Sequence, residues 1–249
     1  MTDSREARNH ASELKFVVDR ATGIAIRSWA RTNLEPDPHG TGPWADEYAT
    51  ASLYFDTVEY DVFRRRGSYG RAKYRIRRYS DADFVFLERK LRRPRLVVKR
   101  RTRIPLDAIH TLSIDGSDST RASSWFTARL AARRLVPVCQ VSYRRLARGS
   151  NGSHPPVRLT LDEDMRATAV SAVAFAGSGG EAILQEGMVL ELKFRGYLPA
   201  IFRRLVEEFA LRPQRSSKYR LGMTVLGHVV PSDDADEPSA PAIQISESV

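Results

Sequence analysis

The chain alternates polar and apolar residues over many short stretches, the pattern of half-buried β-strands. In residues 12–18, for example, Glu13 and Lys15 share one face, and Leu14 and Phe16 share the other. This alternation predicts about eight strands, at residues 12–18, 51–57, 71–79, 84–90, 96–101, 139–144, 156–162 and 188–194.

Apolar residues recur at helical spacing in three other places. The clearest is residues 198–211, where Leu198, Phe202 and Leu205 fall on one side of a helix. The same spacing, less regular, predicts helices in residues 22–34 and 119–135. The chain is therefore expected to have an α+β fold.

Positive charge is concentrated in one region. The 249 residues carry a net charge of +10 at pH 7, and residues 64–103 hold 17 Lys and Arg against three acids. The rest of the chain is consequently net acidic. Such a concentration favours a polyanionic partner, but it does not choose among nucleic acid, anionic lipid and polyphosphate.

Two classes of protein fit poorly. Cys139 is the only cysteine, which excludes an internal disulfide framework and favours a reducing compartment. The N-terminal residues lack the apolar core of a signal peptide, and no run approaches the roughly 18 apolar residues of a membrane span. We expect a cytoplasmic protein that does not span a membrane.

Four cations, Arg71, Lys73, Arg75 and Arg77, occupy every second position and point to one side if this segment is a strand. One such strand could simply face solvent. Because charged faces recur in strand after strand, we expect a closed barrel with a charged interior that binds a polyanion and with helices covering its apolar outer face. Without the anion, each buried cation would cost on the order of several kcal/mol.

Nine short motifs follow one another along residues 13–223. They are ELKF (13–16), SLYFDT (52–57), RAKYRIRRY (71–79), FLERK (86–90), VVKRR (97–101), VSYRR (141–145), VRLTLDEDM (157–165), LELKF (190–194) and SSKYRLGM (216–223). In this order they resemble the motifs of the vacuolar transporter chaperone (VTC) catalytic domain, a polyphosphate polymerase domain of the CYTH-like triphosphate tunnel metalloenzyme superfamily.

The resemblance implies a closed eight-stranded antiparallel β-barrel, a tunnel with a basic interior and helices packed outside. The domain is expected at residues 11–228, after a flexible N-terminus (1–10). Residues 229–249 mix Pro, Ser and acids without apolar periodicity, which predicts a disordered tail. The resemblance also implies binding of ATP, tripolyphosphate or polyphosphate together with a divalent metal.

Roles carry over from the family one residue at a time. The resemblance implies that the transferred phosphoryl group is contacted by Arg75, Arg77, Lys90 and Arg158. It implies that substrate phosphates are bound by Lys15, Arg71, Lys73, Lys99, Arg144, Lys193 and Lys218. Glu191 matches the acidic residue expected to hold the metal.

One departure from the superfamily affects the expected activity. The wider superfamily often opens with E-x-E-x-K, whereas this chain has Ala11, Glu13 and Lys15, so one carboxylate is missing. VTC-type members commonly lack the full motif too, which favours a polymerase over a hydrolase. Glu191, with water and phosphate oxygens and with Asp162 and Glu13 as possible helpers, would then hold Mg²⁺ or Mn²⁺.

The expected function is metal-dependent synthesis of polyphosphate from ATP, in which the anionic nucleophile needs no strong base. A tripolyphosphatase and a non-catalytic polyphosphate sensor are the alternatives. A nucleic-acid-binding module is disfavoured, because it would have no reason to place Glu191 on an inward face. No transmembrane domain is expected in the chain, so coupled export would need a membrane-protein partner.

Overall fold

The computed structural model describes residues 4–8, 11–93, 96–112, 122–150, 156–177 and 179–227. Its strands are β1 (Ser4–Arg8), β2 (Ala11–Val18), β3 (Glu35–Pro36), β4 (Glu47–Asp56), β5 (Ala72–Tyr79), β6 (Phe84–Arg93), β7 (Leu96–Pro105), β8 (Val136–Ser150), β9 (Val157–Ala169), β10 (Glu181–Ala182) and β11 (Met188–Arg195). Its helices are α1 (Arg20–Asn33), α2 (Ser124–Ala132), α3 (Ala200–Glu208) and α4 (Lys218–Val225), with short 3₁₀-helices η1 (Gly67–Arg71) and η2 (Asp107–Thr111).

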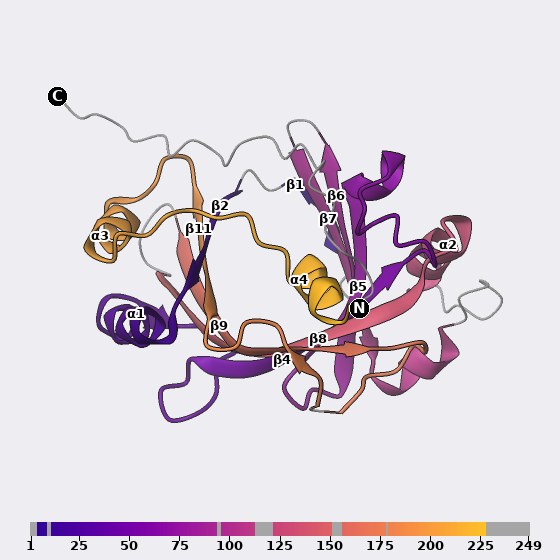
Figure 1. The fold of residues 1–249 in the computed structure, drawn as a ribbon, viewed down its shortest axis with the longest axis horizontal. Coiled ribbons are helices and arrows are strands. Elements are labelled where there is room, and N and C mark those ends of the chain that lie inside the picture. The colour runs from indigo at the N-terminus through magenta and orange to yellow at the C-terminus, as the bar shows by residue number, and fades with distance from the viewer. Residues whose placement is uncertain are drawn as a thin grey trace.

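The strands form one antiparallel sheet in the order β1-β7-β6-β5-β4-β8-β9-β11-β2, with β3 paired to β8 and β10 to β9. In the part of the chain that the structure describes, eight strands have eight residues or more, as the alternation predicts. The sheet is strongly curved, so that β5, β6 and β7 form one wall, β2 and β11 form the other, and α4 lies between them (Figure 1).

The predicted closure of the barrel is not confirmed. Strands β1 and β2 end the order of the sheet, and no pairing joins them among the described residues. The free edge of β2 instead meets the segment that leads into α4, where the backbone N–H of Gln214 donates to the carbonyl of Lys15 at 2.7 Å. This contact uses part of the edge that barrel closure would require.

The two terminal predictions fall largely outside the described residues. Residues 229–249 lie wholly outside them. Within the segment 1–10, residues 4–8 form β1, which pairs with β7.

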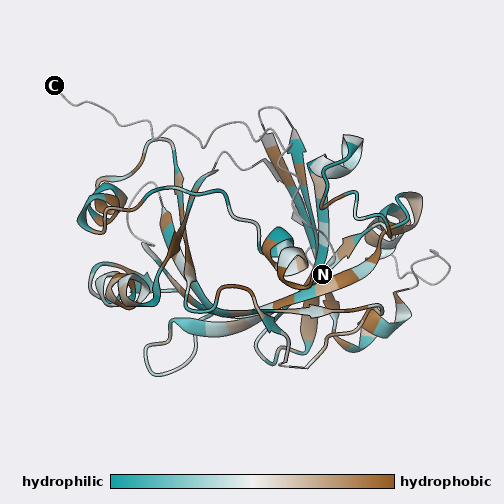
Figure 2. Cartoon of the chain, in the orientation of Figure 1, coloured by the Kyte–Doolittle hydropathy of each residue, from teal (hydrophilic) through white to brown (hydrophobic). Residues whose placement is uncertain are grey.

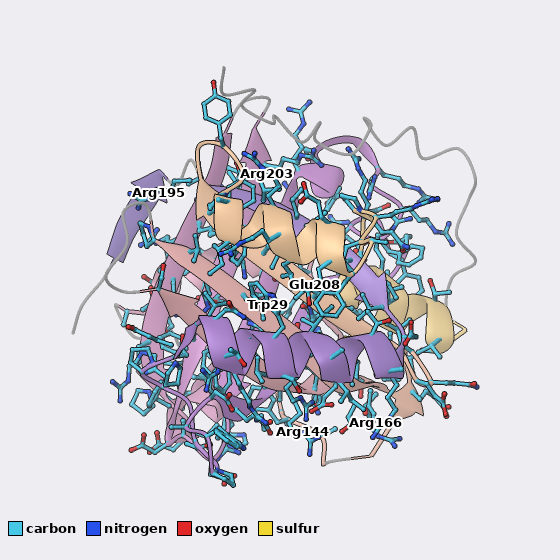
Figure 3. The ribbon with its side chains drawn as sticks, turned by 90° about the vertical axis from the view of Figure 1, so that its left-hand side faces the viewer. Trp29, Arg144, Arg166, Arg195, Arg203 and Glu208 are labelled. Atoms are coloured by element: carbon cyan, nitrogen blue, oxygen red, sulfur yellow. The ribbon has the colours of Figure 1, made fainter. Side chains whose placement is uncertain are left out.

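The predicted helices cover the outer face of the sheet. Figure 3 shows α1 and α3 side by side on this face, with Trp29 between them. They cover a core that includes Phe16 of β2 and Leu190 of β11. On the opposite wall α2 inserts Phe126 against Phe55 of β4, with ring centroids 5.7 Å apart. Figure 2 shows hydrophobic and hydrophilic positions interspersed along these strands and helices.

Helix α4 differs from the others because it packs on the concave face. Its Gly222 lies so close to the sheet that an added Cβ would stand 3.0 Å from Val141, 3.2 Å from Cys139 and 3.4 Å from Ala167. A side chain at this position would force these neighbours to move by a few tenths of an ångström. The sequence pattern did not predict α4, which has eight residues and a mixed composition.

A buried carboxylate fixes α4 to the loop after β4. Asp56 is fully buried and accepts hydrogen bonds from the backbone N–H groups of Thr57 (2.7 Å), Val62 (2.7 Å) and Phe63 (2.9 Å) and from the hydroxyl of Tyr219. Burial raises the pKa of Asp56 despite these donors. The Tyr219 hydroxyl thus connects α4 to this loop.

The substitution Tyr219→Phe is expected to lower the free energy of unfolding by about 1–3 kcal/mol, because it leaves a buried acceptor without one donor. Urea unfolding monitored by circular dichroism would measure it. The control is Tyr197→Phe, at a side chain that is 62% exposed, which should change stability by less than about 0.5 kcal/mol. Equal stabilities of the two variants would contradict a role for this hydrogen bond.

Candidate functional site

The concave face of the sheet brings together most of the residues predicted to bind phosphate. On β5, Lys73, Arg75 and Arg77 alternate with Tyr74 and Ile76, whose side chains are buried in the outer core. The antiparallel register repeats this division on β6 and β7, and on β2, β9 and β11 of the opposite wall. The two-residue period of a strand therefore gathers charges from six strands onto one face.

The first row of cations crosses β5, β6 and β7. Lys73 is the register partner of Lys90, and Lys90 is the register partner of Lys99. The described residues place no carboxylate within ion-pair distance of these three ammonium groups, and like charges directly opposite one another destabilise a sheet. Lys73 Nζ donates instead to the Ser217 hydroxyl at 2.7 Å.

The pKa values in this row reflect the absence of paired carboxylates among the described side chains. Burial, together with the charges of Lys15 and Lys90, lowers the pKa of Lys73 to about 7. The pKa of Lys90 is also lowered by burial and by Lys15 and Lys99, although Glu13 opposes the shift. An anion bound here would relieve the repulsion and raise both pKa values.

In the next row of cations, the positive charges of Arg75 and Arg101 are partly neutralised by Glu88. Glu88 accepts from Arg75 Nε at 2.5 Å and from Arg101 Nε at 2.7 Å. Burial opposes the ionisation of Glu88, but Arg75, Arg77 and Arg101 lower its pKa to about 2. Arg77, two residues after Arg75 on β5, is buried and donates to the Ser52 hydroxyl at 3.0 Å. These guanidinium groups are held in fixed orientations along the face.

Glu191 is the centre of the opposite wall and is surrounded by lysines. Its Oε1 lies 3.0 Å from Lys218 Nζ and 3.3 Å from Lys15 Nζ, and its Oε2 lies 3.0 Å from Lys193 Nζ. Burial opposes the charge, yet Lys218 and Lys15 hold the pKa of Glu191 well below its usual range. Lys15 also pairs with Glu13 at 3.0 Å.

The start of α4 completes this network. Lys218 Nζ lies 2.6 Å from Asp162 Oδ2, and Arg145 donates to both oxygens of Asp162, at 2.6 and 2.8 Å. All three side chains are buried. Burial opposes the charge on Lys218, but Asp162 and Glu191 raise its pKa above the ordinary value.

Arg158 lies farther along the same wall, next to its register partner Lys193. Its NH1 forms an ion pair with Asp37, and its NH2 donates to the Tyr48 hydroxyl at 3.0 Å. The side chain is 41% exposed, so Arg158 stays accessible from this end of the concave face.

Arg144 does not share this face, which corrects its predicted position. Arg144 alternates along β8 with Tyr143 and Arg145, which lie on the same face as Lys218, and its register partner on β4 is Ala49. Arg144 consequently points outward and donates to Glu163 at 2.7 Å, and Glu163 also pairs with Arg27 of α1. Figure 3 shows Arg144 on the outer side, below α1. Its neighbour Arg145 takes the inward position.

Arg71 is also displaced from its predicted place. It ends η1 and precedes the first residue of β5, Ala72, so it does not continue the strand alternation of Lys73, Arg75 and Arg77. Its side chain is exposed.

Arg145 and Arg101 are inward arginines that the sequence prediction missed. Arg145 was missed because the VSYRR motif offers two adjacent arginines and the prediction took Arg144 as the inward one. Helix α4 packs against Cys139 and Val141, so the face of β8 that carries Arg145 is the concave one. Arg101 lies two residues after Lys99 on β7, so strand periodicity places both side chains on the same face. The prediction took only the lysine from the VVKRR motif.

Glu191 could hold a metal ion only together with ligands from the substrate and water. Both oxygens of Glu191 are engaged by ammonium groups, and the described residues hold no group of three or more His, Cys, Asp or Glu able to bind a metal ion. The protein thus presents no preformed cage. A hard cation such as Mg²⁺ or Mn²⁺ suits a single carboxylate when substrate phosphates and water supply the other ligands.

Comparison with solved structures shows the fold. A candidate adenylate cyclase from Bacillus halodurans superimposes with a TM-score of 0.51 at 14% identity, covering 84% of this chain and 96% of its own. A candidate adenylyl cyclase from Hippeastrum, described as having a dominant triphosphatase activity, gives a TM-score of 0.49 at 13% identity, covering 88% of this chain and 97% of its own. None of the curated proteins is similar to this chain in sequence.

The described helices are all too short or too polar to cross a membrane. The family comparison is decisive for classification, because the model of the VTC domain matches residues 10–227 and so covers most of the chain. The resemblance drawn from the nine motifs is confirmed, and this chain belongs to the VTC domain family.

Proposed function

We propose that this protein transfers phosphoryl groups on tri- and polyphosphate, and that it synthesises polyphosphate from ATP on the concave face. Membership of the VTC domain family supports an activity on such substrates. The observation that carries the proposal is the row Lys73, Lys90 and Lys99, whose charges lack carboxylate partners among the described residues. A polyphosphate chain would neutralise this row.

The chemistry requires positioning and charge neutralisation more than covalent participation by the protein. In the proposed reaction, Lys15, Lys73, Lys99, Lys193 and Lys218 would bind phosphate oxygens. Charge that develops on the transferred group would be neutralised by Arg75, Arg77, Lys90 and Arg158. A divalent ion held by Glu191 and the substrate would neutralise further phosphate charge when bound.

The carboxylates of the concave face favour synthesis over hydrolysis. Glu13 and Glu88 have pKa values lowered to about 2, and the pKa values of Asp162 and Glu191 are lowered as well. Such groups are weak bases at neutral pH and would activate water poorly. A phosphate nucleophile is already anionic and needs no such base. The tripolyphosphatase is therefore the second candidate.

Purified protein given ATP and Mn²⁺ or Mg²⁺, with and without a short polyphosphate primer, should form polymer that a gel resolves. Polymer should be lost in the Arg75→Ala/Arg77→Ala variant and in Glu191→Gln, because they remove charge neutralisation and the acidic ligand. Arg144→Ala serves as the matched control and should keep activity within about twofold. Phosphate release from tripolyphosphate without polymer would replace the polymerase by a triphosphatase, and polyphosphate binding with neither product would leave a sensor.

The inward register of the lysines can be tested by binding alone. Lys90→Ala and Lys99→Ala should each weaken tripolyphosphate binding about tenfold or more, because each removes a charged hydrogen-bond donor. Arg144→Ala also removes one positive charge, but from the outer face, and should change Kd less than about twofold. Isothermal titration calorimetry gives the values. Equal losses in all three variants would indicate that only net charge matters.

Lys73 should make tripolyphosphate binding depend on pH. Its pKa of about 7 in the free protein means that the ammonium group is charged below this pH and neutral above it. Affinity should therefore fall as pH rises from 7 to 9, by up to about tenfold per unit. Lys73→Arg keeps its charge and should flatten the profile relative to the wild type. Titration calorimetry at constant ionic strength measures both, and parallel profiles would contradict a role for Lys73.

A further inference from the structure

Three lysines of the concave face have no carboxylate within ion-pair distance among the described residues. Lys73, Lys90 and Lys99, which we call the lysine row, are register partners on β5, β6 and β7. The carboxylates of this face are engaged by other cations, Glu88 by two arginines and Glu191 by three lysines. Burial and neighbouring lysines lower the pKa values of Lys73 and Lys90. An acidic group from another part of the chain would relieve this repulsion.

Such acids are concentrated after the last described residue. Residues 228–249 contain five Asp and Glu and no Lys or Arg. Four of these acids, Asp233, Asp234, Asp236 and Glu237, fall within five consecutive positions, and no other window of five residues in the sequence holds as many. We call residues 233–237 the acidic segment. Its charge is complementary to that of the lysine row.

Helix α4 brings the end of the described chain to the lysine row. The helix lies on the concave face, between the two walls (Figure 1). Ser217, which caps the start of α4, accepts a hydrogen bond from Lys73 Nζ at 2.7 Å. One turn further, the ring centroid of Tyr219 lies 5.2 Å from that of Tyr54 on β4, the strand that pairs with β5. The acidic segment therefore follows a helix that already contacts the row.

The chain between α4 and the acidic segment is long enough to return to the row. Helix α4 has eight residues, so its axis is about 12 Å long. Six residues lead from Gly227 to Asp233 and ten lead to Glu237, and extended chains of these lengths span about 20 Å and about 33 Å. Neighbouring strands lie about 4.8 Å apart, so the row covers about 10 Å across three strands. The acidic segment, extended, matches that length.

The connection to α4 makes a weak contact effective. Lys90 and Lys99 are exposed, and exposed ion pairs between carboxylates and ammonium groups contribute little individually. A segment of the same chain, however, acts at an effective concentration on the order of 1 mM, which favours binding without a strong intrinsic affinity. A polyphosphate that binds the row more tightly would displace the segment.

We propose that the acidic segment of this chain binds the lysine row when no polyphosphate is bound, and that it competes with the substrate for this row. The inference rests on the proposed function, because the competitor that it names is the substrate of that reaction. It goes further by giving the concave face a second ligand, which the chain itself supplies. The acidic segment would therefore lower the affinity of the protein for polyanions.

Neutralising the acidic segment in the full-length chain tests the competition. The variant Asp233→Asn/Asp234→Asn/Asp236→Asn/Glu237→Gln should bind tripolyphosphate about three- to tenfold more tightly at low salt, and the gain should shrink at high salt. Titration calorimetry without divalent metal measures both values and excludes an effect through metal binding.

The matched control removes four negative charges elsewhere. Glu181, Glu186, Glu207 and Glu208 are exposed, and Figure 3 shows Glu208 on α3, which covers the outer face. Their combined change to Gln should alter Kd less than about twofold. Equal gains in the two variants would overturn the inference, because only net charge would then matter. Circular dichroism checks that both variants are folded.

Carbodiimide cross-linking, which joins a carboxylate to an amine in contact with it, locates the segment directly. In wild-type protein without phosphate, mass spectrometry should find amide bonds between residues 233–237 and Lys73, Lys90 or Lys99, and tripolyphosphate should suppress them. Cross-links to the row from Asp115 or Asp118 in place of the acidic segment would overturn the inference. Cross-links between two chains, seen as a dimer on a denaturing gel, would also overturn it, because the segment would then come from a second copy.

Failure of the proposed function would look different. Tripolyphosphate that bound neither the wild type nor the neutralised variant would overturn the proposed function. The cross-links formed without phosphate test the contact of the acidic segment separately.

Discussion

The salt bridges of Lys218 join three parts of the chain at the centre of the concave face. The ammonium group is buried and lies 2.6 Å from Asp162 of β9 and 3.0 Å from Glu191 of β11. Burying a charge is tolerated only when its partners are close and well oriented, so the position of α4 and the positions of both strands depend on one another. Without this cation, Asp162 would keep Arg145 and Glu191 would keep Lys15 and Lys193, but the ion pairs that join α4 to both strands would be lost.

This arrangement divides the concave face into a compensated and an uncompensated part. Around Glu191 and Glu88, acids and bases are matched, and the side chains are held in place by their ion pairs. Along Lys73, Lys90 and Lys99 such acids are lacking among the described residues, and positive potential accumulates. A fixed, preorganised positive potential stabilises the charge of a phosphoryl-transfer transition state without reorganisation during the reaction.

The sequence predicted the parts of the fold that follow from strand periodicity. The alternation of Lys73, Arg75 and Arg77 with buried residues needed no knowledge of the other strands. The inward position of Arg145 could not be predicted, because it depends on the packing of α4 against Cys139 and Val141, which makes their face of β8 the concave one. Helix α4 depends on tertiary contacts of Tyr219 and Gly222 rather than on its own periodicity. Closure of the barrel is not confirmed, and strand periodicity could not decide it, because period-two patterns show which face is buried and not which edges pair.

The same two-residue period also places aromatic residues on the concave face, which a count of charges does not show. In FVFLERKLRR, every second residue lies on the concave face, and these residues change from aromatic to acidic to cationic over a single strand. Phe84 and Phe86 stay half-buried on this face, and each carries a guanidinium group of β7 on its ring, Arg103 at 3.6 Å and Arg101 at 3.8 Å from the ring centroid. The aromatic positions therefore help to orient the cations of the neighbouring strand.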